Sequence, residues 1–414
     1  MRLHIVGLGP IGTLVAHHLR ISLPREHKIT LLHRSKQLAA RERRDGGVIR
    51  IENNGVVTSS TGYHSEVFDE ETHVRCGWKT KQDFLEYKRD MSPGPHTSVT
   101  PLPQIESLIV TVKAQLALPI IECLRPRLSA NSTIVLLQHG LGVYERLIQR
   151  VFRNPETRPQ FVLASNTHGA WLKNYSQVVH TYMGHIEFGI ISNLGHRDFE
   201  ASLKDERVPA PDRRLEINDI TQSNDPHFRR YRSLKLTVAA LSAAEALCSK
   251  WRPIHEVQMT MRRNLVVHAV IDPLTALMGC RNGDIFTERS SKHIAKGICM
   301  EASAAYAREL ESSAHHMLKR FGDVDNRGQI PIGCLPLPLR PRALELECSR
   351  VANITRGRFS PMLIDVRKGH KTEIEYINGY LLRLGAAHGL SMPNNLMLLN
   401  LINMRSSIPL DQIP

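Results

Sequence analysis

The sequence predicts an α/β protein in which an N-terminal doubly wound parallel sheet precedes an all-helical C-terminal domain. Three observations predict this organisation. Short apolar runs alternate with helix-like stretches in the first part of the chain, a glycine-rich turn directly follows the first run, and long helical patterns dominate from about residue 233. Strands that alternate with helices form parallel sheets, because each crossover helix packs back onto a face of the sheet.

The chain has 414 residues, which is enough for two or three domains. We predict a sheet domain over residues 1–190, with a polar, proline-containing insertion at about 68–103. A polar and basic insertion or linker follows over 191–232, and a helical domain covers 233–414.

The individual elements follow from apolar runs and apolar periodicity. Runs of strand length predict buried strands at 3–6, 28–33, 108–112 and 133–137, with helices at 13–19 and 116–124. Apolar residues that recur every three or four positions predict later helices at 234–249, 257–277, 290–321 and 363–388. A proline-rich linker at 331–341 separates the last two.

Residues 7–12 read Gly-Leu-Gly-Pro-Ile-Gly between the first strand and the first helix. In this context the first glycine permits a tight turn, the second lets the backbone approach a pyrophosphate, and the third lets the helix pack on the strand. The N–H groups at the helix N-terminus then attract the phosphates. The motif predicts a Rossmann dinucleotide-binding site, whose candidate residues are Gly7, Gly9, Pro10, Ile11 and Gly12.

The residues after the second strand indicate which dinucleotide is bound. An acidic side chain about twenty residues beyond the glycines would hold the ribose 2′-hydroxyl of NAD. Here the sequence is His33-Arg34-Ser35-Lys36, and a guanidinium with a second cation suits a 2′-phosphate. We therefore predict NADP(H), with Arg34 as the phosphate ligand. The alternative is that Arg34 is a solvated residue at a strand end.

Composition limits the other functions. The net charge is +14 with a pI near 9.6, which favours polyanionic partners such as a phosphorylated cofactor or RNA. A compartment whose proteins tend to be basic, such as the mitochondrial matrix, is the simpler explanation. Aromatics make up only 5% of the residues, so the sequence shows no platform on which RNA bases would stack. No apolar run is long enough to span a membrane. The seven cysteines form no C-x-x-C pair and no metal-ligand pattern, which indicates reduced thiols in an intracellular protein.

Six further motifs follow the glycine turn along the chain. They are Val-Lys-Ala (112–114), Gln-His-Gly-Leu-Gly (138–142), Thr-His-Gly-Ala (167–170), Ile-Asp-Pro-Leu-Thr-Ala (271–276), Asn-Gly (282–283) and Thr-Glu-Ile-Glu-Tyr-Ile-Asn-Gly (372–379). Taken in order with the glycine turn, these motifs resemble the ketopantoate reductase (2-dehydropantoate 2-reductase) family. The resemblance implies a Rossmann domain joined to an all-helical domain, with the active site in the cleft between them. The implied reaction is hydride transfer from NADPH to the ketone of ketopantoate, which yields pantoate for the coenzyme A pathway.

Four residues match functional positions of the family. The resemblance implies that Glu373 is the active-site glutamate that binds the substrate hydroxyl and that Lys113 lies beside cofactor and substrate. It also assigns Arg34 to the 2′-phosphate, and Asp365 matches an acid eight residues before the glutamate. The alternative for Glu373 is an acid early in a long helix, where it stabilises the helix N-terminus.

Other positions depart from the family pattern. The catalytic lysine, nine residues before the proline of the 271–276 motif, is replaced by Asn264, which has no transferable acidic proton. Loss of a general acid typically costs about 10²–10⁴-fold in rate. The remaining departures are His139 for the cofactor-site asparagine, His268 and Asp272 for two asparagines, Arg358 for the substrate asparagine and Pro361 for a serine.

Two functional hypotheses are consistent with these residues. The first is an NADPH-dependent reductase of ketopantoate or another small 2-oxo acid, with Glu373, Lys113 and Asn264 at the catalytic positions and His268, Asp272 and Arg358 as further substrate ligands. The second is a non-catalytic descendant that contacts RNA or a ribosome, with a mitochondrial location favoured over the cytoplasm. In that case Arg229, Arg230 and Arg232 would bind phosphates. A homodimer is a further expectation.

Overall fold

The computed structural model describes residues 1–68, 103–192, 197–320 and 335–408, and the chain divides into two compact units. The first unit comprises residues 1–138 and 143–257, and the second comprises 139–142 and 258–414. The boundary lies later than the predicted 233, because α7 (Phe228–Ala243) packs on the sheet of the first unit. Its Ser233 and Thr237 hydroxyls bond strand hydroxyls at 2.9 and 2.7 Å, and Leu234 is fully buried.

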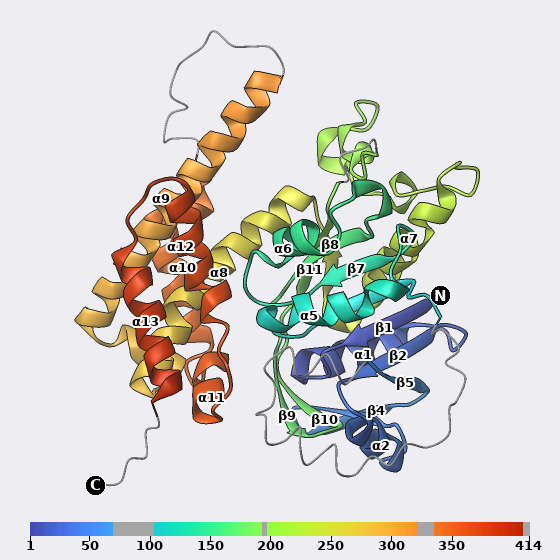
Figure 1. Ribbon diagram of the computed structural model, residues 1–414, viewed down its shortest axis with the longest axis horizontal. Helices are drawn as coiled ribbons and strands as arrows, with labels where there is room; N and C mark the ends of the chain where they lie inside the picture. The colour runs from blue at the N-terminus through green and yellow to red at the C-terminus, as the bar shows by residue number, and fades with distance from the viewer. Residues whose placement is uncertain (69–102, 193–196, 321–334, 409–414) are drawn as a thin grey trace. The chain divides into compact units, whose positions relative to one another are not determined.

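The first unit is built on an eight-stranded sheet, which confirms the predicted α/β class (Figure 1). The four predicted strands correspond to β1, β2, β6 and β7, which pair in parallel in the order β7-β6-β1-β2. Only β8 and β11 are antiparallel neighbours in this sheet of the described chain. In spatial order the strands are β12 (Ser249–Trp251), β11 (Ile186–Ile190), β8 (Gln160–Asn166), β7 (Thr133–Leu136), β6 (Ser107–Val110), β1 (Arg2–Val6), β2 (Lys28–His33) and β5 (Tyr63–Val67).

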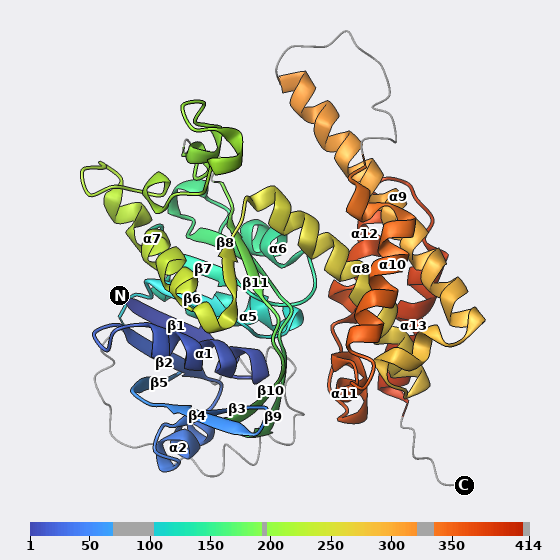
Figure 2. The ribbon, with the colours of Figure 1, turned by 180° about the vertical axis from the view of Figure 1, so that it is seen from behind.

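Helices cover both faces of this sheet. Figure 1 shows α5 and α6 in front of it, and Figure 2, from behind, shows α1 and α7 on the other face. A second sheet of order β4-β3-β10-β9 packs on the outer side of α1, so that α1 is enclosed between the two sheets. These elements are α1 (Pro10–Ser22), α2 (Lys36–Arg44), α5 (Ala114–Leu124), α6 (Val143–Arg150), β3 (Ile49–Asn53), β4 (Val56–Ser60), β9 (Gly169–Asn174) and β10 (Gln177–Tyr182).

The second unit is a helical bundle with its own core, as predicted. The central helix α9 contacts α10, α12 and α13 through small buried residues such as Ala302 and Ala305, which let the neighbouring helices approach closely. The helices are α8 (Ile254–Met278), α9 (Arg289–Arg320), α10 (Pro341–Ile354), α11 (Pro361–Arg367), α12 (Asn378–Ala387) and α13 (Pro393–Ser407).

The single helix predicted at 363–388 is wrong, because two helices occupy this stretch. α11 ends at Arg367, and Gly369 adopts a left-handed φ of +64° that terminates it. A single 3₁₀ turn, η10 (Ile374–Tyr376), precedes α12. The apolar periodicity misled the prediction because the turn and the helix both direct their apolar residues toward the same core.

The predicted insertions are only partly described. Most of 68–103 lies outside the described residues, as does much of the 331–341 linker. The described part of the 191–232 stretch forms three short 3₁₀ turns and then enters α7. Within the described ranges, no helix combines the length and the apolarity needed to cross a membrane. The 3₁₀ turns of the described chain not yet given are η1 (Arg125–Arg127), η2 (Pro155–Thr157), η3 (Ala201–Lys204), η4 (Ala210–Asp212), η5 (Ile217–Asp219), η6 (Glu245–Leu247), η7 (Asn282–Phe286) and η9 (Leu337–Leu339).

Candidate functional site

The glycine turn between β1 and α1 has a different steric requirement at each glycine. Gly7 adopts a φ of +100°, and a Cβ there would lie 2.5 Å from the backbone nitrogen of Val112. At Gly12 a Cβ would lie 2.2 Å from the Gly7 carbonyl oxygen, so that no side chain fits between helix and strand. At Gly9 the nearest such atom is 4.0 Å away, which leaves the space above this residue open.

The N-terminus of α1, next to Gly9, offers backbone N–H donors to a ligand. Gly9 is the N-cap residue, Pro10 begins the helix, and no side chain caps the first amides. The first turn contains no acidic residue that would repel an anion. The Thr111 hydroxyl donates to the Gly7 carbonyl oxygen at 2.8 Å and holds the turn against the end of β6. Clash at the first and third glycines and open space at the second is the pattern that a bound pyrophosphate requires, so these residues fit a dinucleotide.

At the end of β2 an exposed Arg34 follows a buried His33. The nearby acid, Glu42, is also buried and lies 2.6 Å from His33 Nε2, and it accepts a hydrogen bond from Ser65 at 2.7 Å. His33 Nδ1 bonds the Tyr175 hydroxyl at 2.8 Å. This carboxylate is therefore engaged inside the unit, and the exposed end of the strand is cationic.

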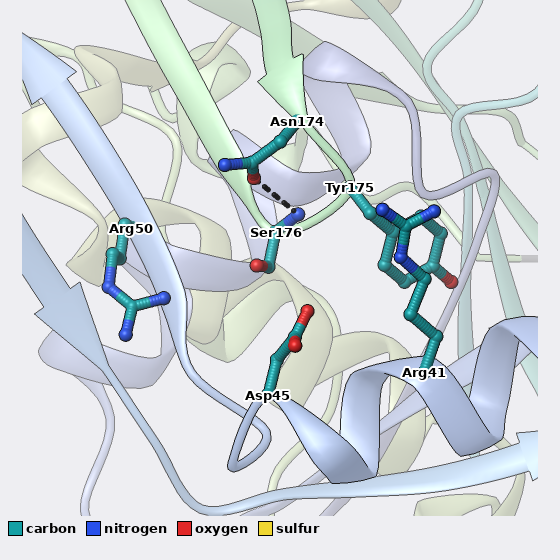
Figure 3. A pocket seen from close by; sticks show the side chains of 6 residues that line it. All are labelled: Arg41, Asp45, Arg50, Asn174, Tyr175 and Ser176. Carbon is teal, nitrogen blue, oxygen red and sulfur yellow. Dashed lines mark hydrogen bonds between the residues drawn. The ribbon is translucent and has the colours of Figure 1, made fainter.

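A pocket of about 280 Å³ lies beyond α2, lined by Arg41, Asp45, Arg50, Asn174, Tyr175 and Ser176 (Figure 3). The Arg41 guanidinium lies 5.7 Å from the centre of the Tyr175 ring. Burial and the Glu42 charge raise the pKa of Tyr175 to about 12, against the opposing charges of Arg34 and Arg41. The pocket contains none of the predicted site residues, although Tyr175 links it to the end of β2.

Lys113 lies where the middle strand ends, as the sequence predicts. It is the N-cap residue of α5, three residues after the end of β6, and its carbonyl oxygen accepts from the Leu116 amide at 2.9 Å. Parallel strands of such sheets present their carboxyl ends to ligands, and Gly7, Lys113 and Arg34 all follow the carboxyl ends of strands in this sheet.

In the helical unit, a proline inside α8 leaves a backbone acceptor without its usual donor. Pro273 lacks the N–H that would bond the carbonyl oxygen of Ala269 four residues earlier. The side-chain amide of Asn378 donates to this oxygen at 3.1 Å, and the same nitrogen donates to Asn395 at 3.0 Å. Asn378 therefore fastens the start of α12, and the Glu373 turn before it, to the middle of α8.

The loop 139–142 is held to the same region. The Leu141 amide donates to the Tyr376 carbonyl oxygen at 3.0 Å, and the Leu141 side chain packs against the helical core. His139 consequently lies against His268 of α8, with ring centres 4.6 Å apart and planes tilted by 56°. Burial, reinforced by the His268 charge, lowers the pKa of His139 to about 3, so that this ring is neutral near neutral pH.

His268 and Asp272 form an ion pair on one face of α8. Their Nδ1 and Oδ2 atoms are 3.1 Å apart, and Asp272 is 7% exposed. Burial opposes a charge on His268, but the charge and hydrogen bond of Asp272, together with the charge of Glu373, raise the pKa of this histidine above its ordinary value. The pKa values of the two neighbouring histidines are therefore shifted in opposite directions.

The structure thus brings four predicted residues, His139, His268, Asp272 and Glu373, into one neighbourhood of the helical unit. Glu373 does not begin a long helix, because it is the N-cap residue of the short turn η10 and is half-buried. Asn264 lies one helical turn before His268 on α8.

Arg358, a further predicted residue of this unit, lies in the loop before α11. The Arg358 carbonyl oxygen accepts from the Asn282 amide at 2.9 Å, which joins the 282–283 motif to the Arg358 loop. Ser360 is buried and caps α11, and it accepts from Thr275 of α8 at 2.6 Å. Sequence reasoning missed Asn378 and Ser360 as positioning residues, although the proline in the predicted helix was a signal that a carbonyl needs another donor.

Comparisons with known proteins agree with this description. Residues 3–193 match the family model described as ketopantoate reductase PanE/ApbA, and residues 256–406 match its C-terminal counterpart. The 2-dehydropantoate 2-reductase of Yersinia pestis is 26% identical over 304 residues, which cover 73% of this chain and 75% of that protein. A probable 2-dehydropantoate 2-reductase of Schizosaccharomyces pombe is 20% identical over 97% of this chain and 96% of that protein. The ketoisovalerate reductase of Beauveria bassiana is 24% identical over 94% of this chain and 80% of that protein.

Solved structures share the fold. D-mandelate dehydrogenase with NADH and anilino(oxo)acetate matches with a TM-score of 0.64 and 15% identity, over 98% of both chains. The probable 2-dehydropantoate 2-reductase of Bacillus subtilis matches with a TM-score of 0.54 and 20% identity, over 98% of this chain and 100% of that chain. The two family models together span the glycine turn and the Glu373 turn, and the chain belongs to the ketopantoate reductase family.

Proposed function

We propose that this protein is an NADP(H)-dependent reductase of a 2-oxo acid, with ketopantoate as the leading substrate. The observation that carries the proposal is the glycine turn, which closes at Gly7 and Gly12 and stays open at Gly9 beside an uncapped helix N-terminus. The preference for a 2′-phosphate rests on exposed Arg34 and on the engagement of Glu42 with His33.

The substrate class rests on the relatives. The names of the Yersinia pestis and Beauveria bassiana proteins specify ketopantoate and ketoisovalerate, which are both 2-oxo acids with a branched carbon next to the ketone. Reduction of such a ketone requires a hydride at the carbonyl carbon, a donor at the carbonyl oxygen and a cationic or polar partner for the carboxylate.

The proposed roles divide between cofactor and substrate. A bound NADPH supplies the hydride, and Gly7, Gly9, Pro10, Ile11 and Gly12 hold its pyrophosphate while Arg34 holds its 2′-phosphate. Glu373 accepts a hydrogen bond from a substrate hydroxyl, and Arg358 pairs with the substrate carboxylate. Lys113 and His139 are cofactor-side residues, and Asn264 can only donate a hydrogen bond.

The test is a fluorescence titration of the purified protein with NADPH and, separately, with NADH, followed by addition of ketopantoate or ketoisovalerate. Tighter binding of NADPH, with oxidation of the cofactor upon addition of either acid, supports the proposal. Absence of NADPH binding contradicts the cofactor assignment. Binding without oxidation across a panel of 2-oxo acids contradicts the reductase.

The alternative of RNA or ribosome contact has no structural observation in its favour. Arg230 donates to the backbone carbonyl oxygens of Glu156 and Pro155 at 2.9 and 3.4 Å, so its guanidinium takes part in a contact within the first unit. Arg229 and Arg232 are exposed near the start of α7. This alternative, the homodimer and the mitochondrial location stay predictions.

A further inference from the structure

Reduction of a ketone needs a proton donor, and Asn264 cannot be that donor. An amide side chain carries no acidic proton near neutral pH, so the family's lysine position contributes no general acid in this chain. A proton donor within the helical unit must therefore be another ionisable side chain.

The position of His268 on α8 makes it the candidate proton donor. Residues four apart on a helix lie on the same face, about 6 Å apart along the axis, so His268 follows Asn264 on the face that it shares with Asp272. Asp272 takes Nδ1 at 3.1 Å, which fixes the ring and leaves Nε2 as the nitrogen that can donate to a ligand. A quarter of the His268 side chain (25%) is exposed.

Nearby charges make the pKa of His268 differ from that of the neighbouring His139. The described groups that act on its titration are Asp272 on the same helix, His139 from the loop 139–142, and Glu373 at the start of η10. The two carboxylates favour a proton on His268, whereas His139 is neutral. The pKa of one ring of this tilted pair is thus raised and that of the other is lowered, so His268 keeps its proton to a higher pH than His139 does.

We propose that His268 is the general acid of this protein, held by Asp272 as a positioning residue, and that it replaces the lysine missing at Asn264. This inference rests on the proposed reductase function. The site for the proton has moved by one helical turn along α8, from the first position of the 264–268–272 face to the second.

The step balances with the groups named. A reduced nicotinamide, when bound, supplies the hydride that becomes the new C–H bond. The N–H bond at His268 Nε2 breaks, its electron pair stays on the imidazole, and the proton forms the O–H bond of the hydroxy acid. Neutral His268 then regains a proton from solvent, and Asp272 stabilises the imidazolium that results.

The experiment combines a titration without cofactor and a rate measurement. Histidine C–H resonances of the protein without cofactor are followed by NMR against pH, and the His268 signal is assigned by its loss in His268→Asn. We expect His268 to titrate above the ordinary value of 6.5 and Asp272→Asn to lower its midpoint. An unchanged midpoint in Asp272→Asn overturns the positioning role.

The rate measurement compares variants on the 2-oxo acid that the wild type reduces best. His268→Asn should lower kcat by about 10²–10⁴-fold with little change in NADPH affinity. In the wild type, kcat should fall as pH rises through the His268 pKa, because the acid must be protonated. Asn264→Lys combined with His268→Asn should recover part of the rate and shift this decline to higher pH, because a lysine keeps its proton longer.

His255→Asn is the matched control, since His255 is an exposed histidine in the first turn of the same helix and should leave kcat unchanged. A wild type that reduces no 2-oxo acid overturns the proposed function and this assignment with it. An active wild type with equal kcat in His268→Asn overturns the acid alone and leaves the reductase intact.

Discussion

The absence of side chains in the glycine turn decides whether a ligand can approach its backbone. At Gly7 and Gly12 a methyl group collides with backbone of the unit itself, so substitution disturbs the fold as well as any ligand. Gly9 differs because its α-carbon faces open space, and its φ is not in the left-handed region. This position therefore separates an effect on binding from an effect on folding.

We predict that Gly9→Ala folds normally and loses NADPH affinity by at least about tenfold, because the added methyl group occupies the space that a pyrophosphate needs. Thermal unfolding and NADPH fluorescence titration together measure this. Gly357→Ala is the control, since a Cβ at Gly357 meets nothing within 4 Å and this residue lies in the other unit. Unchanged NADPH affinity in Gly9→Ala would contradict the assigned role of the turn.

Arg34 allows a second prediction at this scale. A charge-assisted hydrogen bond contributes about 1.5–3 kcal/mol, or roughly 10–100-fold in affinity. Arg34→Ala should therefore weaken NADPH binding by that factor and leave NADH binding nearly unchanged, because only NADPH carries the 2′-phosphate. Arg25→Ala, an exposed arginine before β2, is the control. Equal losses for both cofactors would refute a 2′-phosphate contact.

At the scale of elements, α8 and α12 depend on one side-chain amide. Pro273 deprives the Ala269 carbonyl of its helical donor, and buried Asn378 replaces that donor while it also bonds Asn395. Removing Asn378 leaves two buried acceptors without a donor. The arrangement also explains how the Glu373 turn is kept near His268, since Asn378 lies only five residues after Glu373.

We predict that Asn378→Ala lowers the free energy of unfolding by about 1–3 kcal/mol, the usual cost of a buried polar group left unsatisfied. It should also reduce kcat more than NADPH affinity, because the displaced turn carries Glu373. Circular dichroism with urea measures the stability. Asn403→Ala, on the exposed side of α13, should change it by less than about 0.5 kcal/mol. Equal stability of the two variants would contradict this account of α8.

At the scale of the whole molecule, buried histidines make the first unit sensitive to acid. Burial lowers the pKa of His4 and of His17 to about 4. Both side chains are buried in the first unit, and His17 bonds Ser60 and Thr58 at 2.8 and 3.1 Å. In the unfolded chain a histidine takes up a proton near pH ~6.5. The unfolded state therefore binds more protons than the native state between these two values.

It follows that the contribution of these two histidines to the free energy of unfolding is constant above about pH 7 and decreases as the pH falls from about 6.5 toward 4. The tryptophans of the described residues, Trp171 and Trp251, both lie in the first unit, so their fluorescence reports on that unit. Urea unfolding at about pH 7.5 and 5 measures the change. His17→Asn should reduce the loss of stability between these pH values, and exposed His64→Asn should not. A stability that does not depend on pH over this range would be inconsistent with neutral buried histidines.

Much of the fold could be predicted because its signals are local. The four strands and the glycine turn depend on short apolar runs and on backbone geometry, and the structure places them at the predicted positions. Arg34 and Lys113 could be located for the same reason, since each directly follows a predicted strand. The break at Gly369 and the packing of α7 escaped prediction, because helical periodicity does not show which core a helix joins.

The sequence by itself determined the α/β class and the family, and it predicted the dinucleotide turn and the replacement of the family's lysine by Asn264. Only the tertiary structure decided which groups gather one helical turn beyond that position. The contact of His139 with His268, the ion pair with Asp272 and the nearby charge of Glu373 join residues from up to 234 positions apart, between 139 and 373. Burial and charge in that neighbourhood shift the pKa values of the two histidines in opposite directions, because the pKa of a side chain depends on its surroundings in the folded chain rather than on its place in the sequence.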